Sequence, residues 1–232
     1  MCCLFLAASS TVAIAQTSVV DLVNPIIGTN GMGHTFPGAC VPFGLVQLSP
    51  DTDTIPHNVD GKYQPRSYEY CAGYQHKDSS IVGFSHTHFS GTGHSDLGDI
   101  LIMPTTGTLK LNPGTATNPD GGYRSRFSHG TEISRPGYYE VMLTDYGVKA
   151  QLTTTQRVGI HKYTYPTNSE NQRIILDMIH GIYNYDGKVL WTNIRVENDT
   201  LVTGYRITNG WARTNYTYFA MSFSKPITHY GC

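Results

Sequence analysis

The sequence predicts an all-β fold, a large antiparallel β-sandwich, and three observations support this. No long segment keeps the apolar period of 3.6 residues that an amphipathic helix requires. Short apolar or alternating runs recur along the chain after residue 38 instead. Gly, Pro, Asn and Asp separate these runs at the regular spacing that is typical of strands in sandwiches and barrels.

The expected strands differ in how much of each is buried. Val41–Leu48 and Ile100–Met103 are apolar runs of the kind found in buried strands. Tyr138–Thr144 and Val148–Thr155 alternate apolar and polar residues around Asp145-Tyr146-Gly147, which predicts a hairpin. Further strands are expected over Gly159–Tyr165, Arg173–Ile179, Val189–Val196, Leu201–Ile207 and Tyr216–Phe223.

The beginning of the chain predicts export. An apolar run ends in small residues at Ala13 and Ala15, which fits a signal peptide over residues 1–15, cleaved before Gln16. The alternative is a buried N-terminal strand or helix. No second long apolar segment follows, so no transmembrane segment is expected, and the location would be periplasmic or extracellular.

Residues 16–232 are expected to form one β-sandwich domain. The best loop, Leu111–Gly122, has strands of the same character on both sides, so it does not mark a domain boundary. Outside the leader the cysteines are Cys40, Cys71 and Cys232, which allow at most one internal disulfide. Cys40 and Cys71 are expected to be either bridged or separately buried.

Composition limits the classes of partner. The formal net charge is −1, from 16 basic and 17 acidic residues, so the chain lacks the basic excess that a nucleic-acid partner requires. Charged residues make up only 14% of the chain, and tyrosine is abundant at 16. Neutral polar surfaces of this kind suit neutral hydroxylated ligands.

The segment GFSHTHFSGTGHSDLGD, Gly83–Asp99, is the richest in chemistry. If the strand before it continued, His86 and His88 would point to one face, where an H-x-H pair can bind zinc. A third ligand would come from His94, Asp96 or Asp99. Alternatively, these histidines line a polar pocket or hydrogen-bond the surrounding turns.

The same segment excludes two other kinds of site. Gly91 and Gly93 do not form a phosphate loop, because no Gly-Lys-Ser/Thr sequence and no helix follow them. Ser85 has no G-x-S-x-G context, so it is not expected to be a hydrolase nucleophile. Nucleotide binding and serine hydrolysis are therefore not predicted.

Two further clusters lie earlier in the chain. Gly28–Gly44 is rich in glycine around His34, which indicates either an irregular loop or close approach of the backbone to another group. Tyr68, Tyr70 and Tyr74 surround Glu69, and such aromatic rings either stack on sugars or fill a core. Glycoside hydrolysis needs two carboxylates that face one site. Among the acids of these clusters, Glu69, Asp96 and Asp99, none is marked as the proton donor.

Taken together, the clusters resemble glycoside hydrolase family 92, which contains exported bacterial exo-acting α-mannosidases. The likeness rests on VNPIIGTNGMGHTFPGACVPFGLVQLSPDT, YEYCAGYQHKDSSIVGFSHTHFSGTGHSDLGDILIMP, RPGYYEV and NGWARTNYTYFAMSFSKP, and runs from about Val23 to Pro226. It implies a galactose-mutarotase-like N-terminal sandwich followed by an (α/α)6 barrel, which this chain does not contain.

The resemblance also implies roles. The reaction would invert anomeric configuration and depend on a calcium ion, with the catalytic acid and base and most calcium ligands on the barrel. This chain alone is therefore expected to be inactive, with no catalytic or metal-binding residue of its own. The residues expected to bind the α-mannoside are Tyr68, Tyr70, His86, His88, Gly91 and Gly93, supported by His34, Asp96 and Asp99.

The sequence departs from the family pattern at one pair of positions, and two alternative functions remain open. Tyr68 and Tyr70 stand where relatives usually have tryptophan, which offers a larger stacking face. The chain could instead be a stand-alone carbohydrate-binding module or adhesin of the same fold. A third hypothesis is a metal-dependent hydrolase that uses the H-x-H site.

Overall fold

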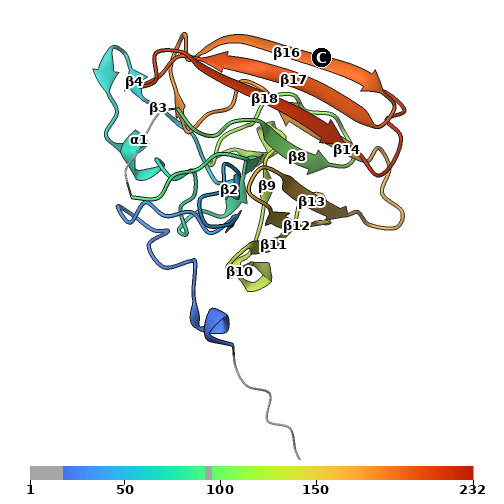
Figure 1. The fold of residues 1–232 in the computed structure, drawn as a ribbon, viewed down its shortest axis with the longest axis horizontal. Helices are drawn as coiled ribbons and strands as arrows, with labels where there is room; N and C mark the ends of the chain where they lie inside the picture. The colour runs from blue at the N-terminus through green and yellow to red at the C-terminus, as the bar shows by residue number, and fades with distance from the viewer. Residues whose placement is uncertain (1–17, 92–95, 232) are drawn as a thin grey trace, which may run out of the picture.

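The computed structural model, which describes residues 18–91 and 96–231, confirms the all-β fold (Figure 1). Most of its strands belong to antiparallel sheets of five, four and three strands. The helices of the described residues are single short turns: η1 (Val19–Leu22), α1 (Arg66–Glu69), η2 (Pro119–Gly121) and η3 (His129–Thr131).

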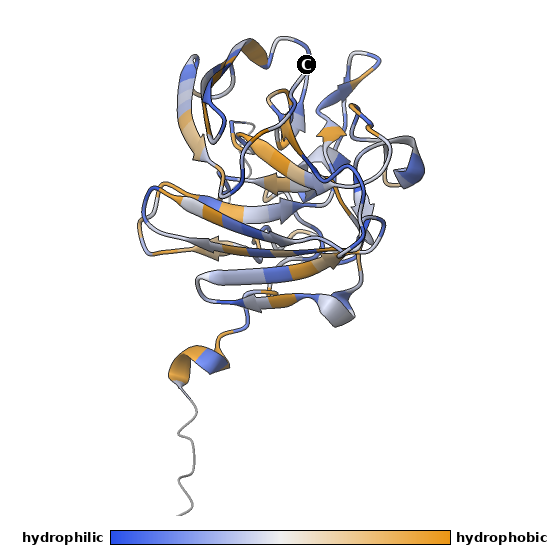
Figure 2. Cartoon of the chain, turned by 90° about the vertical axis from the view of Figure 1, so that its right-hand side faces the viewer, coloured by the Kyte–Doolittle hydropathy of each residue, from blue (hydrophilic) through white to orange (hydrophobic). Residues whose placement is uncertain are grey.

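The first two sheets form the sandwich. The five-stranded sheet has the order β1 (Ala39–Cys40), β2 (Gln47–Asp51), β7 (Gly83–Ser85), β8 (Leu101–Thr105) and β14 (Arg173–Asp177). The four-stranded sheet is a meander of β10 (Ile133–Arg135), β11 (Tyr138–Leu143), β12 (Val148–Thr154) and β13 (Gly159–Thr164). Buried and partly exposed residues alternate along β11 and β12. Figure 2 shows hydrophobic and hydrophilic residues interspersed along the strands of the molecule.

A third sheet lies beside the sandwich, at the top of Figure 1. It consists of β16 (Val189–Asn198), β17 (Leu201–Thr208) and β18 (Asn215–Ser222) in this order. Short paired segments complete the fold: β3 (Ile55–Pro56) with β15 (Tyr183–Asn184), β4 (Asn58–Val59) with β5 (Lys62–Tyr63), and β6 (Ser80–Ile81) with β9 (Ser125–Arg126).

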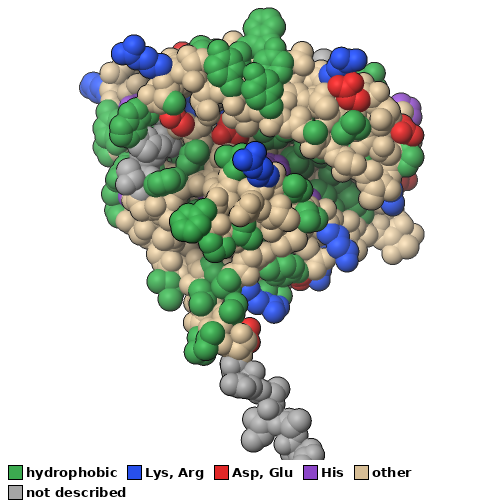
Figure 3. All heavy atoms as spheres, in the orientation of Figure 1, with side chains coloured by type: hydrophobic (Ala, Val, Ile, Leu, Met, Phe, Trp, Pro, Cys, Tyr) green, Lys and Arg blue, Asp and Glu red, His purple; other side chains and the backbone are tan. Residues whose placement is uncertain are grey.

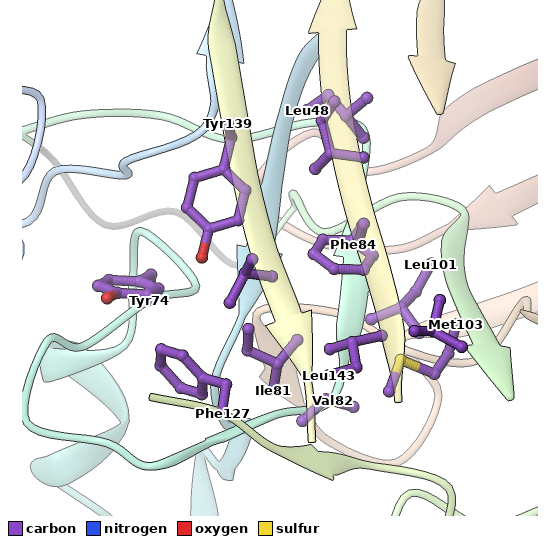
Figure 4. Close-up of a cluster of buried hydrophobic side chains, with 14 of the residues drawn as sticks. Leu48, Tyr74, Ile81, Val82, Phe84, Leu101, Met103, Phe127, Tyr139 and Leu143 are labelled. Atoms are coloured by element: carbon purple, nitrogen blue, oxygen red, sulfur yellow. The ribbon is translucent and has the colours of Figure 1, made fainter. Parts of the chain in front are cut away.

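The hydrophobic core fills the space between the five-stranded and four-stranded sheets (Figure 4). Leu48, Phe84 and Leu101 from the first sheet are fully buried. They belong to one cluster with Tyr139 and Leu143 of the second. Burial of each large side chain contributes about 1.5–3 kcal/mol, so this cluster is the main apolar support of the domain.

The predicted strands are confirmed with one exception. The hairpin is found at β11 and β12, with Tyr139 opposite Leu152. The expectation of a strand over Val41–Leu48 is wrong for its first half, because Gly44 N–H donates to Val41 O and closes a turn. Phe43 adopts a positive φ of 58° in this turn and is fully exposed. Pro42 and Gly44 are the residues that favour this turn over a strand.

The β16–β18 sheet has two different faces. Its inner face buries Val202, Arg206 and Thr208. On the outer face, cross-strand pairing aligns Trp191 with Ile207 and Ile207 with Tyr216. The next row pairs Tyr205 with Tyr218, whose ring centroids lie 5.5 Å apart. Hydrophobic side chains accordingly gather over these strands at the top of Figure 3.

The structure also answers two questions that the sequence left open. Cys40 and Cys71 are both free, the first exposed and the second buried, so they are not bridged. None of the helices within residues 18–91 and 96–231 has the length and apolar character needed to cross a membrane. The predicted signal peptide, residues 1–15, lies outside the described residues.

Candidate functional site

The segments singled out in the sequence meet on one side of the molecule. Gly91 N–H donates to His34 O at 2.8 Å, which joins the histidine-rich segment to the glycine-rich loop. The ring of His34 packs edge-on against Tyr68 at a centroid distance of 4.7 Å. Gln75 then ties the tyrosine segment to the same loop, since its side chain binds both N–H and C=O of Gly31. We call this meeting point the loop cluster.

A small apolar cluster supports the loop cluster from beneath. Cys71, Ile182 and Tyr183 are buried together, and Tyr68 and Leu97 pack against them. A backbone hydrogen bond joins the same two segments, since Ile182 N–H donates to Leu97 O at 3.0 Å. The histidine-rich segment and the region before β16 therefore pack against the same apolar cluster.

A fourth segment, the β17–β18 connection, joins the loop cluster through Asp96. The carboxylate of Asp96 accepts the backbone N–H of Trp211 at 2.7 Å and that of Ala212 at 2.9 Å. Trp211 itself is 70% exposed, and its position is fixed at the edge of the loop cluster by this carboxylate. Sequence reasoning did not single out Trp211, although Asn209-Gly210-Trp211 is a turn that presents an aromatic residue.

The two tyrosines expected to stack on sugar lie in different environments. Tyr68 is partly exposed at the loop cluster. Tyr70 is only 2% exposed, and its hydroxyl donates to Asp78 at 3.1 Å. Burial, with the nearby Asp78 carboxylate, raises the pKa of Tyr70 well above its ordinary value. In this domain Tyr70 therefore offers no free ring face to a ligand.

Gly91 has the backbone conformation that its sequence context suggested. Its φ is 97°, in the left-handed region that favours glycine, and the residue is exposed. A side chain at this position would be strained even though the space around it is open. Gly93 and His94 lie outside the described residues.

His88 belongs to a buried network centred on Asp51. Its Nδ1 lies 2.7 Å from Gln47 O and its Nε2 lies 2.8 Å from Asp51 Oδ1. His180 Nε2 approaches the other carboxylate oxygen, also at 2.8 Å. Burial alone would raise the pKa of Asp51, but His88 and His180 outweigh it and lower that pKa overall.

This network leaves His88 no ring nitrogen for a sugar. Carbonyl and carboxylate oxygens only accept hydrogen bonds, so both nitrogens of His88 act as donors within the domain. Asp51, His88 and His180 are also fully buried. The contacts make His88 a residue that holds β2 and the histidine-rich segment together.

His86 belongs to a separate network. Its Nδ1 lies 2.7 Å from Ile100 O, and its Nε2 lies 3.0 Å from His161 Nε2. His161 Nδ1 in turn lies 2.7 Å from the hydroxyl of Tyr163. Since Ile100 O only accepts, His86 donates from Nδ1, His161 donates from Nε2, and Tyr163 donates to His161. Burial lowers the pKa of both histidines, which keeps them neutral in this arrangement.

The two histidines of the H-x-H motif thus point to different partners. β7 ends at Ser85, so the alternation that would place His86 and His88 on one face stops before either residue. Their rings contact different strands, and neither joins a group of three metal-ligating residues among those the structure describes. Among the described residues, the H-x-H pair therefore does not form part of the zinc site that the sequence allowed as an alternative; His94, a candidate third ligand, lies outside them.

Asp99 forms the third buried network. It accepts Arg206 Nε at 2.8 Å and the hydroxyl of Thr87 at 2.7 Å, while its own N–H donates to Thr87 Oγ1. Arg206 also donates to the carbonyl oxygens of Met178 and His180. These bonds fix the histidine-rich segment to β17. Arg206 is fully buried, so the ion pair is held in a low dielectric.

Lys188 lies in the same region, but its ammonium group is not paired in the way that Arg206 is paired with Asp99. Its side chain is buried, and Nζ has no hydrogen-bond partner in the described part of the chain. Burial, with the nearby charge of Arg206, lowers the pKa of Lys188 to about 7. The roles of Asp51, His180, Lys188 and Arg206 were not anticipated from the sequence. Asp51 lies near the end of the first family motif without marking a site, and the other three residues lie outside the motifs.

The described residues do not fit the calcium ion that the family resemblance implies. Calcium prefers six to eight oxygen ligands, whereas Asp51 and Asp99 are already bonded to histidine and arginine. Within residues 18–91 and 96–231, the group of side chains able to ligate a metal consists of His76, His129 and Glu132, with two nitrogen donors. It lies outside the predicted site.

Comparison with known proteins identifies the family. The profile of the glycosyl hydrolase family 92 N-terminal domain matches residues 22–232. The chain belongs to glycoside hydrolase family 92. This match covers nearly the whole chain and confirms the resemblance carried by the sequence motifs.

Solved structures of the family share this fold. The family GH92 α-mannosidase BT3965 from Bacteroides thetaiotaomicron, in complex with mannoimidazole, is 44% identical with a TM-score of 0.80; the match covers 90% of this chain and 26% of that one. The inverting mannosidase BT2199 from Bacteroides thetaiotaomicron is 26% identical with a TM-score of 0.64, over 91% of this chain and 26% of that one.

A curated relative is more distant. An uncharacterized secreted glycosidase from Arthroderma benhamiae is 28% identical over 170 residues, which is 69% of this chain and 19% of the relative. The chain thus spans about a quarter or less of the length of the proteins it matches.

Proposed function

We propose that this chain is the sugar-binding and domain-docking β-sandwich of an exported exo-α-mannosidase that acts on α-mannosides of glycans. The observation that carries the proposal is the loop cluster, where four segments of family 92 motif sequence meet at one surface. The 44% identity to an α-mannosidase whose structure was solved in complex with mannoimidazole supports the substrate class.

The loop cluster suits recognition of a neutral sugar. Tyr68 and Trp211 supply aromatic side chains at its surface, and such rings stack on the C–H faces of sugars. Its carboxylates are engaged, since Asp96 holds backbone N–H groups and Asp99 holds Arg206. The cluster therefore binds and positions rather than performs acid–base chemistry, for which inverting enzymes need two carboxylates about 6.5–9.5 Å apart.

The catalytic groups belong to a further domain in this proposal. The solved relatives are about four times as long as the segment they share with this chain, which supports a C-terminal catalytic domain of (α/α)6 type in the same polypeptide. That domain would supply the acid, the base, the inverting geometry and the ligands of a calcium ion. The sandwich would close one side of the mannose site.

We assign domain docking to the outer face of the β16–β18 sheet. Trp191, Tyr216 and Tyr218 are each more than half exposed on it, and Ile207 and Tyr205 lie between them. Large exposed aromatic faces of this kind mark interaction surfaces. The catalytic domain of the longer polypeptide is the partner that the length of the relatives supports.

The test compares the chain with the complete reading frame that contains it. We expect the longer protein to release mannose from an α-mannobioside and the purified 232-residue chain to release none. Mannose release by the chain alone contradicts the proposal that the catalytic groups belong to a further domain. Inactivity of the longer protein on a panel of α-mannosides contradicts the substrate class.

Two matched variants of the longer protein separate the two surfaces. Trp211→Ala should raise KM or lower kcat/KM at unchanged thermal stability. Trp191→Ala should lower the stability of the longer protein with little effect on the isolated chain. If both changes act only on stability, the sugar-binding role of the loop cluster is wrong.

The aromatic outer face also favours a second function, a carbohydrate-binding module or adhesin. Three exposed aromatic residues on one sheet could bind a glycan directly. In that case the isolated chain should be retarded by mannan in affinity electrophoresis, and Trp191→Ala should abolish the retardation. No observation favours the third hypothesis, hydrolysis at the H-x-H motif, since His86 and His88 bond to different partners within the domain.

A further inference from the structure

Two segments far apart in the sequence bring two imidazoles and a carboxylate together at the base of the loop cluster. His76 follows the tyrosine segment, while His129 begins η3 and Glu132 ends it. The rings of His76 and His129 stack at a centroid distance of 3.9 Å and an angle of 31°. Nδ1 of His129 lies 2.8 Å from Glu132 Oε2. One ligand atom from each residue lies within 4.8 Å of the others.

We propose that His76, His129 and Glu132 form a binding site for one zinc ion, or a similar divalent transition-metal ion, with its remaining position open to solvent. The site is independent of the proposed mannosidase function.

The donor set selects this class of metal. Two imidazole nitrogens and one carboxylate oxygen suit zinc, cobalt, nickel or copper, whereas calcium and magnesium prefer oxygen ligands only. Three protein ligands with an open position are a recurring arrangement for zinc. Ligand atoms about 2.0–2.1 Å from a tetrahedral zinc lie roughly 3.3 Å from one another. The ligand atoms of the three residues lie within 4.8 Å of one another, so binding an ion requires them to draw closer together.

Two tyrosine hydroxyls hold the Glu132 carboxylate in a fixed orientation. Its side chain is only 3% exposed, and it accepts the Tyr139 hydroxyl at 2.6 Å and the Tyr74 hydroxyl at 2.9 and 3.0 Å. Both hydroxyls are donors, since the Glu132 carboxylate oxygens accept them. Metal-ligating carboxylates are commonly oriented by such hydrogen bonds.

A salt bridge alone accounts for only part of this geometry. The contact of His129 with Glu132 is an i, i+3 ion pair when the imidazole is protonated. That pair lies within η3 and its end, and it gives no reason for His76, from a distant segment, to stack on the His129 ring at 3.9 Å. A metal ion requires both imidazoles in their neutral form and holds them next to one carboxylate.

The position of the site gives the ion a structural effect. His76 N–H donates to Thr29 O, and the neighbouring Gln75 binds Gly31, so this segment anchors the glycine-rich loop. Glu132 directly precedes β10 at the edge of the four-stranded sheet. A bound ion would cross-link the base of the loop cluster to the sandwich.

The experiment uses the purified chain, freed of any polyhistidine tag and of metal by chelation. Calorimetric titration with ZnCl2 should show one equivalent bound, and the midpoint of thermal unfolding should rise. Co²⁺ should give the visible absorption of a low-symmetry site, while CaCl2 and MgCl2 should change neither signal. His76→Ala and His129→Ala should each weaken zinc binding at least about tenfold, and the double variant should abolish it.

The controls separate this site from binding at other histidines. His229→Ala removes an exposed histidine elsewhere and should leave zinc binding unchanged. Circular dichroism shows whether the variants remain folded, and Glu132 is left intact because two buried tyrosines depend on it. Stoichiometric zinc binding that persists in the double variant overturns the proposal. So does the absence of zinc binding and of any change in unfolding midpoint for the unaltered chain.

Discussion

The five-stranded sheet packs against different chemistry on its two sides. Toward the four-stranded sheet, Leu48, Phe84 and Leu101 meet apolar side chains. Toward the β16–β18 sheet and the loop cluster, buried polar groups prevail, led by Asp51 with its histidines and Asp99 with Arg206. The apolar side resists change through packing, whereas the polar side depends on each charge having its partner. The loop cluster lies on the polar side, so the geometry of the candidate site depends on electrostatic pairing.

The largest expected effect is on the polar side, at Asp99. Asp99→Asn keeps the size of the side chain but leaves Arg206 buried without a counter-charge. We expect the free energy of unfolding to fall by about 3–5 kcal/mol, measured by urea denaturation. The exposed ion pair of Arg126 with Asp120 is the control, and Arg126→Ala should change the midpoint far less.

A double variant tests the reason for this loss. Combining Asp99→Asn with Arg206→Met removes the unpaired charge, so part of the lost stability should return. If the double variant is no more stable than Asp99→Asn alone, the ion pair is not what joins the histidine-rich segment to β17.

On the apolar side, Leu143→Ala should cost about 3 kcal/mol. Leu143 is fully buried between the two sheets, so truncation removes apolar contacts and leaves a cavity. Equilibrium unfolding in urea measures the change, with Leu111→Ala as the control at an exposed leucine. Equal effects of the two substitutions would show that the space between the sheets is not the core.

These two sides also differ in how far the sequence predicts them. The hairpin of β11 and β12 follows directly from alternation, because a period of two determines both the strand and its buried face. Asp99 belongs to the histidine-rich segment, but Arg206 lies outside the motifs, and only the fold brings the two together. The loop cluster was predictable as a set of segments from family motifs. The individual roles of His86 and His88 were not, since they depend on partners such as His161 and Asp51.

A substitution at His86 tests whether this residue has the structural role that the sequence did not predict. The expected effect on the free energy of unfolding is intermediate. His86→Leu leaves Ile100 O and the N–H of His161 buried without their partner, which should cost about 1–3 kcal/mol at neutral pH. The folded pKa of His86 lies below its ordinary 6.5, so the unfolded chain binds more protons and acid lowers stability as pH falls through 6.5. The stability of the variant should therefore depend less on pH in this range. Lost activity of the longer protein at unchanged stability would instead make His86 a ligand-binding residue.

Over a single pH unit, the smallest expected effect has the opposite sign and concerns Lys188. Its pKa is about 7 in the folded chain against 10.5 in the unfolded chain, so between these values only the unfolded chain holds the proton. Stability should rise from pH 7 upward, by at most about 1.4 kcal/mol per pH unit. Lys188→Met should remove this rise and stabilise the protein at pH 7, because no charge then needs to be buried. Denaturation curves at a series of pH values measure it, with the exposed Lys225→Met as the control. Parallel profiles for Lys188→Met and the unaltered chain would mean that Lys188 reaches a partner or solvent. The polar side would then contain no uncompensated charge, and it would differ from the apolar side only in being fully paired.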